Sequence, residues 1–225
     1  MSKKIKWTIL LVLIVLICSF TLMKSNSDIV LMLEKIANEM RMFAVILHII
    51  SFILLLLGVL IKKLRTQFLV SFLLLVSLSA FLVGVKYFVL PNILIFGTFF
   101  ILTVSVFRKK GLEFHFKTAK LLDKIIGILS LIFAFYYLHW VDAPVYLNSL
   151  IYSPLGILNC PTMLAFTGLL CFVNKKETKY LEVFVGSITL YFGFLGMLCL
   201  GAHIDVVLII SGAFILMRYA TKLKY

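Results

Sequence analysis

The chain has 225 residues, of which 63% are hydrophobic and only 14% are charged. An ordinary soluble domain is roughly 45–50% apolar and about 25% charged, so these proportions exclude a water-soluble globule. The apolar residues come in long blocks separated by short Lys/Arg clusters, which is the pattern of several transmembrane helices. The formal net charge of +13 therefore indicates membrane topology. Nucleic acid is excluded as a partner, because no basic face with interleaved aromatic residues accompanies the charge.

Eight apolar segments remain when the chain is divided at its charged and turn residues. They lie near residues 7–23, 42–61, 68–90, 91–107, 121–140, 156–173, 181–200 and 203–219. Each is close to the roughly 20 residues that cross a hydrocarbon core of about 30 Å. Their continuous Leu/Ile/Phe runs favour helices over barrel strands, which would alternate apolar and polar residues. The sequence thus predicts one all-α domain over residues 1–225, a polytopic transmembrane helical bundle of about eight spans.

The Lys and Arg residues are distributed unevenly over the connections between these segments. If the N-terminus is cytoplasmic, 18 of the 22 fall on the inner side, and the outer side keeps only Lys24, Lys35, Arg41 and Lys86. Short cytoplasmic loops carry an excess of Lys and Arg. This asymmetry predicts that both termini are cytoplasmic and that the lipid bilayer of a cell membrane surrounds the chain.

Two segments near the N-terminus require a separate interpretation. The first apolar run follows Lys3, Lys4 and Lys6 and resembles a signal peptide, but no small-x-small cleavage site follows Cys18, so we expect an uncleaved anchor. Residues 28–40 place apolar side chains on one stripe and charged side chains on the other. This predicts a short amphipathic helix on the outer membrane surface, with Ser27 or Asp28 as its N-cap. It is either an ordinary connector or a gate or partner site.

Polar residues at the predicted outer ends of the last four spans form the main candidate site. Six side chains that bind cations or protons share this membrane level: His139, Asp142, Cys160, Cys199, His203 and Asp205. Imidazole and thiolate suit Zn²⁺ or a copper ion, so a divalent or soft metal is the candidate cofactor, although the spacing matches no CxxC or HExxH signature. The alternatives are an interfacial belt of His, Trp and Tyr beside two buried thiols, or a disulfide between Cys160 and Cys199.

Two polar or helix-breaking features lie inside the expected spans. His48 is surrounded by Ile, Leu and Val in the second span, where it is either a neutral residue bonded to a neighbouring helix or a ligand or proton carrier. Pro161 falls five residues into the sixth span and removes a helical hydrogen bond there. The freed carbonyl must be met by Thr162, Thr167, another helix or water. Broken helix starts of this kind line substrate pathways in transporters.

Three groups of short motifs follow one another along the chain. They are Leu90-Pro91-Asn92 with Phe96-Gly97 and Phe100, Cys160-Pro161-Thr162 with Thr167-Gly168, and Gly196 to Leu200-Gly201 with Asp205 and Gly212. This order resembles a bacterial family of multi-pass membrane proteins classed as a domain of unknown function. The Cys-Pro-Thr element is the most specific part, and the first span is an addition to the family's usual pattern. The resemblance implies this fold, a bacterial cytoplasmic membrane and an important sixth span, but no reaction.

Three classes of function fit these observations. A small-solute or ion carrier or channel explains a chain devoted to membrane spans with few polar groups inside them. An accessory or scaffold subunit, bound to another membrane protein or to a second copy, explains the same helices. A membrane-embedded metal- or cofactor-dependent enzyme needs the outer residues to converge at one depth. An enzyme is the least expected of the three, because only the outer set offers such groups. The longest cytoplasmic connection, Arg108 to Lys124, is too short and basic for a catalytic lobe.

Overall fold

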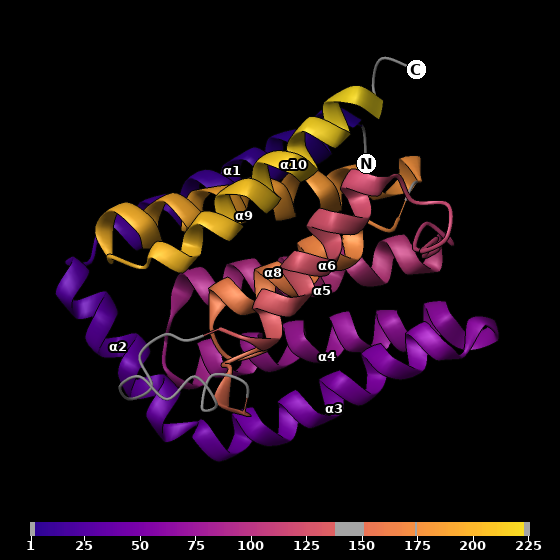
Figure 1. The fold of residues 1–225 in the computed structure, drawn as a ribbon. Helices are drawn as coiled ribbons and strands as arrows, with labels where there is room; N and C mark the ends of the chain where they lie inside the picture. Colours follow the sequence, from indigo (N-terminus) through magenta and orange to yellow (C-terminus); the bar gives the residue numbers. More distant parts are fainter. Residues whose placement is uncertain (1–2, 138–150, 174, 223–225) are drawn as a thin grey trace.

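The computed structural model describes residues 3–137, 151–173 and 175–222, and these residues form helices joined by short connections (Figure 1). The helices are α1 Lys3–Leu22, α2 Asn26–Glu39, α3 Arg41–Leu60, α4 Arg65–Lys86, α5 Leu90–Arg108, α6 Leu121–Phe135, α8 Asn159–Leu170, α9 Lys179–Cys199 and α10 Val206–Lys222. Short 3₁₀ turns precede α4, α9 and α10, at η1 Lys62–Leu64, η2 Lys176–Thr178 and η3 His203–Asp205. The predicted all-helical fold is confirmed for the described residues.

Six stretches are long and apolar enough to cross a membrane. They are Lys4–Leu22, Arg41–Leu60, Lys62–Lys86, Leu90–Arg108, Lys176–Cys199 and His203–Thr221. Their surroundings agree with this assignment, because only four residues of α3 are buried and large apolar side chains such as Ile46, Ile49 and Phe52 are exposed. Contiguous apolar surface of this kind suits a lipid environment. The chain is therefore a membrane protein.

The two other expected spans correspond to shorter helices. The described part of α6 has 15 residues and α8 has 12. At about 1.5 Å per residue, α8 is about 18 Å long, which is less than a hydrocarbon core of about 30 Å. Other helices enclose it, and every residue of α8 except Cys160 is buried. Eight spans thus stays a prediction, since α6 leads toward residues 138–150, which lie outside the described residues.

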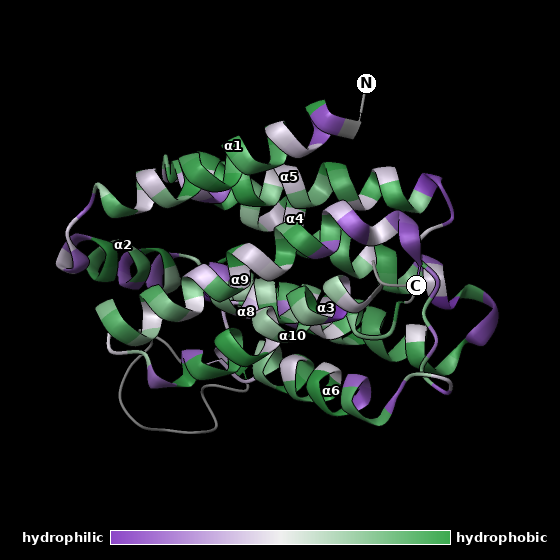
Figure 2. Ribbon diagram, turned by 90° about the horizontal axis from the view of Figure 1, so that it is seen from above, coloured by the Kyte–Doolittle hydropathy of each residue, from purple (hydrophilic) through white to green (hydrophobic). Residues whose placement is uncertain are grey.

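The helices run between two ends of the bundle, and the polar residues gather at those ends (Figure 2). The start of α1, the end of α10, the α3–α4 connection and the α5–α6 connection all lie at one end (Figure 1). This end carries most of the Lys and Arg residues. The opposite end holds α2, the α4–α5 turn and the α9–α10 turn. The clustering of basic connections at one end agrees with the predicted topology, and the cytoplasmic location of that end stays a prediction.

The amphipathic helix α2 lies across this opposite end of the bundle. Its N-cap is Ser25, whose hydroxyl accepts a hydrogen bond from the Asp28 amide at 3.2 Å, so the expected cap at Ser27 or Asp28 was two or three residues too late. The apolar stripe is confirmed, because Ile29, Ile36 and Ala37 are buried. The stripe joins a cluster with residues of α3, α4 and the segment before α8, so α2 packs on protein, and its place on the membrane surface stays a prediction.

A tyrosine in the α4–α5 turn is hydrogen-bonded to the end of α2. The Tyr87 hydroxyl donates a hydrogen bond to Oε2 of Glu39 at 2.6 Å. Desolvation, followed by the bond to Glu39 and its charge, raises the pKa of Tyr87 to about 12. The neutral hydroxyl therefore holds α2 in place over the ordinary pH range.

Candidate functional site

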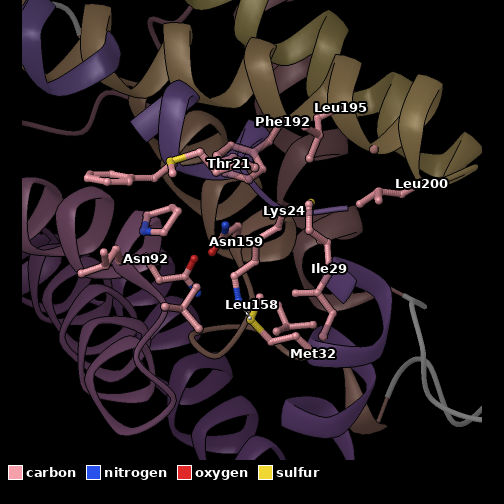
Figure 3. Close-up of a pocket in the computed structure, with 18 of the residues that line it drawn as sticks. Thr21, Lys24, Ile29, Met32, Asn92, Leu158, Asn159, Phe192, Leu195 and Leu200 are labelled. Atoms are coloured by element: carbon pink, nitrogen blue, oxygen red, sulfur yellow. Dashed lines mark hydrogen bonds between the residues drawn. The ribbon is translucent and has the colours of Figure 1, made fainter. Parts of the chain in front are cut away.

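A pocket of about 330 Å³ lies beneath α2, and we call it the α2 pocket (Figure 3). Its walls come from the end of α1, from α2, from the α4–α5 turn and the start of α5, from Tyr137, from the start of α8 and from α9. Most lining side chains are apolar, among them Ile29, Met32 and Phe192. Asn92 and Asn159 are the amide side chains in this wall, and both are buried. The pocket thus combines an apolar body with a few placed polar groups, as small-molecule sites do.

The start of α8 is positioned by a tight loop. Gly156 has φ of +74°, a conformation that favours glycine, and its amide donates to the Thr162 hydroxyl at 2.8 Å. The same hydroxyl donates to the Leu158 carbonyl at 2.7 Å. Thr162 therefore ties the loop to the first turn of α8, which fixes Asn159 between them.

The structure corrects the expected role of Pro161. α8 begins at Asn159, so Pro161 is its third residue and lies in the first turn. The amides of the first turn have no intrahelical acceptor in any case, so proline removes no helical hydrogen bond there. Pro161 therefore starts the helix and does not break it, and Thr162 closes the preceding loop without serving a freed carbonyl.

Asn159 is the polar group of the α2 pocket that stands out by its lack of a partner. Its side chain is 8% exposed, and its Oδ1 atom has no hydrogen-bond partner among the residues that the structure describes. Buried polar atoms in folded proteins are almost always bonded. The Oδ1 atom has almost no accessible surface, so this unpaired acceptor is enclosed by protein behind the pocket wall.

Three polar side chains meet directly behind the wall of the α2 pocket. The Tyr137 hydroxyl donates to Oδ1 of Asp205, and the Cys160 thiol lies 3.8 Å from Oδ2 of the same carboxyl group. Tyr137 and Cys160 line the pocket, whereas Asp205 is 1% exposed. Across the described ranges, no Lys, Arg or His forms an ion pair with Asp205. The carboxyl group thus has only neutral donors as its recorded partners.

The structure brings two residues of the predicted metal site together and leaves two others exposed. Cys160 and Asp205 come together as expected, but Cys199 and His203 are exposed. The proposed disulfide is not formed, since Cys160 and Cys199 are both free thiols. His139 and Asp142 lie outside the described residues. Within the described part of the chain, no group of three or more His, Cys, Asp or Glu could hold a metal ion, so the metal stays a prediction.

His48 lies apart from this site. Its ring meets the Phe135 ring edge to face with centroids 4.9 Å apart. Its Nδ1 atom finds no hydrogen-bond partner in the described ranges, but the ring has a hydrogen bond with the backbone of Ser153, in the segment before α8. The residue borders α6 and is not part of the α2 pocket.

A second pocket of about 570 Å³ lies at the other end of α8, and we call it the Arg218 pocket. Arg218 forms an ion pair with Asp123, with Nε 3.3 Å from Oδ1. Its guanidinium also donates to the carbonyls of Leu170 and Val173, which end α8 and the segment after it. A cation suits the negative end of a helix dipole. Sequence reasoning assigned no role to this pair, and an acid in the first turn of the expected fifth span was its only signal.

A comparison of the chain with protein-family models, curated proteins and solved structures found no match. The class of the protein therefore follows from the fold and the site alone. It is a helical membrane protein with an enclosed short helix and a pocket at each end of that helix.

Proposed function

We propose that this membrane protein is a carrier for a small, largely apolar solute. The observation that supports the proposal is the position of α8 between two pockets. Asn159 and Cys160 at its start line the α2 pocket, and Cys171 and Phe172 just after its end line the Arg218 pocket. Because α8 is only about 18 Å long, both pockets fit within the thickness of a membrane. Interrupted helices with a site at their ends are a feature of several transporter folds.

The contacts at the two ends of α8 suit a carrier that opens one pocket at a time. Both end groups come from the η3–α10 segment, with Asp205 near the start of α8 and Arg218 at its end. Any shift of α8 relative to α10 changes the contacts at both ends together. Packed interfaces of this kind switch between two distinct arrangements and do not deform continuously.

Two native thiols allow a direct test, because Cys160 lines the α2 pocket and Cys171 lines the Arg218 pocket. The full chain with Cys18→Ser and Cys199→Ser is placed in liposomes and treated with a membrane-impermeant maleimide, with octanol as the solute probe. A carrier is expected to show opposite changes, in which the solute slows the labelling of one thiol and speeds that of the other. A Cys171→Ser variant identifies the signal from Cys160.

Two outcomes contradict the carrier proposal. If octanol slows the labelling of Cys160 and leaves Cys171 unchanged, the protein binds the molecule without alternating access, which is the behaviour of an accessory or sensor subunit. If neither rate changes at any octanol concentration that the liposomes tolerate, α8 is a static part of the fold.

A further inference from the structure

The Arg218 pocket differs from the α2 pocket in the charge of its lining. We infer that it binds an anionic phospholipid, whose phosphate group lies among polar side chains at the start of α6 and whose acyl chain lies on the apolar walls. The inference goes beyond the proposed function, because a lipid bound in this pocket requires no transport.

Three polar side chains of the lining are accessible to a ligand. They are His115, Thr118 and Lys120, and all three are exposed. Lys120 forms no ion pair within the part of the chain that the structure describes. Its ammonium group can donate three hydrogen bonds, and the Thr118 hydroxyl can donate one. Hydrogen bonds from a cation to a phosphate oxygen are among the strong ones, so these two side chains suit a phosphate group.

The negative charges near these side chains are balanced within the protein. Asp123 also lines the pocket, and its Oδ1 atom lies 3.3 Å from Nε of Arg218. Glu113 lies 3.7 Å from the His115 ring, and its carboxylate pairs with Lys175 at 3.1 Å. A phosphate group in the pocket therefore meets carboxylates whose charge is compensated.

Positive charge remains in excess around the pocket. The stretch from residue 117 to residue 124 contains one acid, Asp123, and three lysines, Lys117, Lys120 and Lys124. The predicted inner connections together hold 18 Lys and Arg but only four Asp and Glu. Such an excess raises the local concentration of anions. Basic pockets between membrane helices bind the head groups of anionic lipids for this reason.

Aromatic residues at the same end indicate the depth of the pocket in the membrane. The centroid of the Trp7 ring lies 4.8 Å from that of Tyr180 and 6.2 Å from that of Tyr219. Trp and Tyr are enriched at the level of the lipid head groups. Tyr219 follows Arg218 directly in α10, and the α5–α6 connection lies at the same end of the bundle (Figure 1). The Arg218 pocket is therefore close to the level of the lipid phosphate groups.

The apolar walls of the pocket suit an acyl chain. Phe172 and Phe214 are buried in the wall, whereas Leu122 of α6 and Met217 of α10 are 53% and 61% exposed. These two exposed side chains continue the apolar outer surface of the bundle into the pocket, so a lipid can enter from the bilayer. The volume of about 570 Å³ lies within the range of small-molecule sites.

The test compares two lipids that differ only in the head group. The purified full chain in nanodiscs is photolabelled with phosphatidylglycerol or with phosphatidylcholine, each carrying the same diazirine on one acyl chain. Mass spectrometry then maps the labelled peptides. The measured quantity is the ratio of the two labelling yields at peptides of the Arg218 pocket, and differences between the nanodiscs cancel when this ratio is compared between variants.

Phosphatidylglycerol is expected to label residues 118–124 and 214–221 several-fold more than phosphatidylcholine does. Lys120→Gln should lower this ratio roughly fivefold, because one Lys at a membrane surface contributes about that factor. Lys120→Arg keeps the charge and should retain the ratio. Lys63→Gln is the matched control, since this exposed lysine belongs to the same basic end but does not line the pocket, and it should leave the ratio unchanged.

A competition experiment distinguishes a lipid from a soluble phosphate compound. Excess glycerol 1-phosphate is added to the nanodiscs and compared with sodium chloride of equal ionic strength. If the ligand is a lipid, the two additions should reduce the labelling equally, because glycerol 1-phosphate has no acyl chain to bury in the pocket. If glycerol 1-phosphate alone abolishes the labelling, the pocket binds a soluble phosphate compound and the lipid is rejected.

Three other results would overturn the inference. They are equal labelling by the two lipids, labelling away from the Arg218 pocket, and an effect of Lys120→Gln no larger than that of Lys63→Gln. The thiol experiment in liposomes of phosphatidylcholine tests the carrier without the anionic lipid, so the two proposals fail separately. A preference for phosphatidylglycerol without opposite changes at Cys160 and Cys171 would keep the lipid site and reject only the carrier.

Discussion

The position of Asp205 depends on the absence of a side chain at Gly196. A Cβ atom at residue 196 would overlap Oδ2 of Asp205 and lie 2.7 Å from Cγ of the same residue. Gly196→Ala therefore forces the carboxyl group away from Tyr137 and Cys160. Overpacking costs about 1–3 kcal/mol and the loss of a buried hydrogen bond about 1–3 kcal/mol, so we expect roughly 2–6 kcal/mol of destabilisation. At about 2–4 °C per kcal/mol for a chain of this length, that lowers Tm by roughly 4–24 °C.

Thermal unfolding of the purified protein in detergent measures this effect. Gly97→Ala is the matched control, because the nearest atoms to a Cβ there are Phe81 ring carbons at 3.4 Å, an ordinary contact. It should be neutral or slightly stabilising, since alanine is the better helix former. In a background of Asp205→Ala, Gly196→Ala should cost much less, because the carboxyl group is gone. If Gly196→Ala is as stable as Gly97→Ala in the wild-type background, the arrangement of Asp205 behind the pocket is refuted.

Three further predictions concern the rest of the fold. Arg218→Leu leaves Asp123 and two carbonyls unpaired and should cost roughly 3–5 kcal/mol of stability, measured by thermal unfolding. Adding Asp123→Leu should restore part of the lost stability. No recovery would mean that the two residues do not interact. The pKa of Tyr87, about 12, exceeds the ordinary 10.0, so its bond to Glu39 stabilises the fold below about pH 10 and is lost as the pH rises through about 12. Tyr87→Phe should therefore flatten the curve of stability against pH in this range. An unchanged curve would contradict the assignment. A cysteine at Lys109 should react with an impermeant maleimide only from the cytoplasmic side, and reaction from outside would invalidate the span assignment.

Hydropathy was sufficient for the class of the fold and for most of its helices. Six expected spans match helices of the structure to within four residues at each end. The amphipathic stripe of residues 28–40 was also predictable, and Ile29, Ile36 and Ala37 are buried as the spacing requires. These features follow from local rules, because each residue in lipid or at its surface must match its surroundings whatever the other helices do.

The beginning of α8 was not predictable in the same way. Hydropathy places a span from residue 156, since the apolar run continues through Leu155, Ile157 and Leu158. In the structure those residues form a closed loop around Gly156, and the helix begins at Asn159. The loop depends on the hydrogen bonds of Thr162, and hydropathy does not count hydrogen bonds. The role expected for Pro161 was wrong for the same reason.

The sequence by itself determined that this chain is a helical membrane protein with its basic residues gathered at one end, because lipid and charge act on each segment separately. Only the tertiary structure decided that Asp205 meets Tyr137 and Cys160, that Arg218 meets Asp123, and that Asn159 lies in the wall of a pocket beneath α2. These partners lie tens of residues apart in the chain. Which of them meet depends on the faces that the helices turn toward one another, and close packing between helices sets those faces.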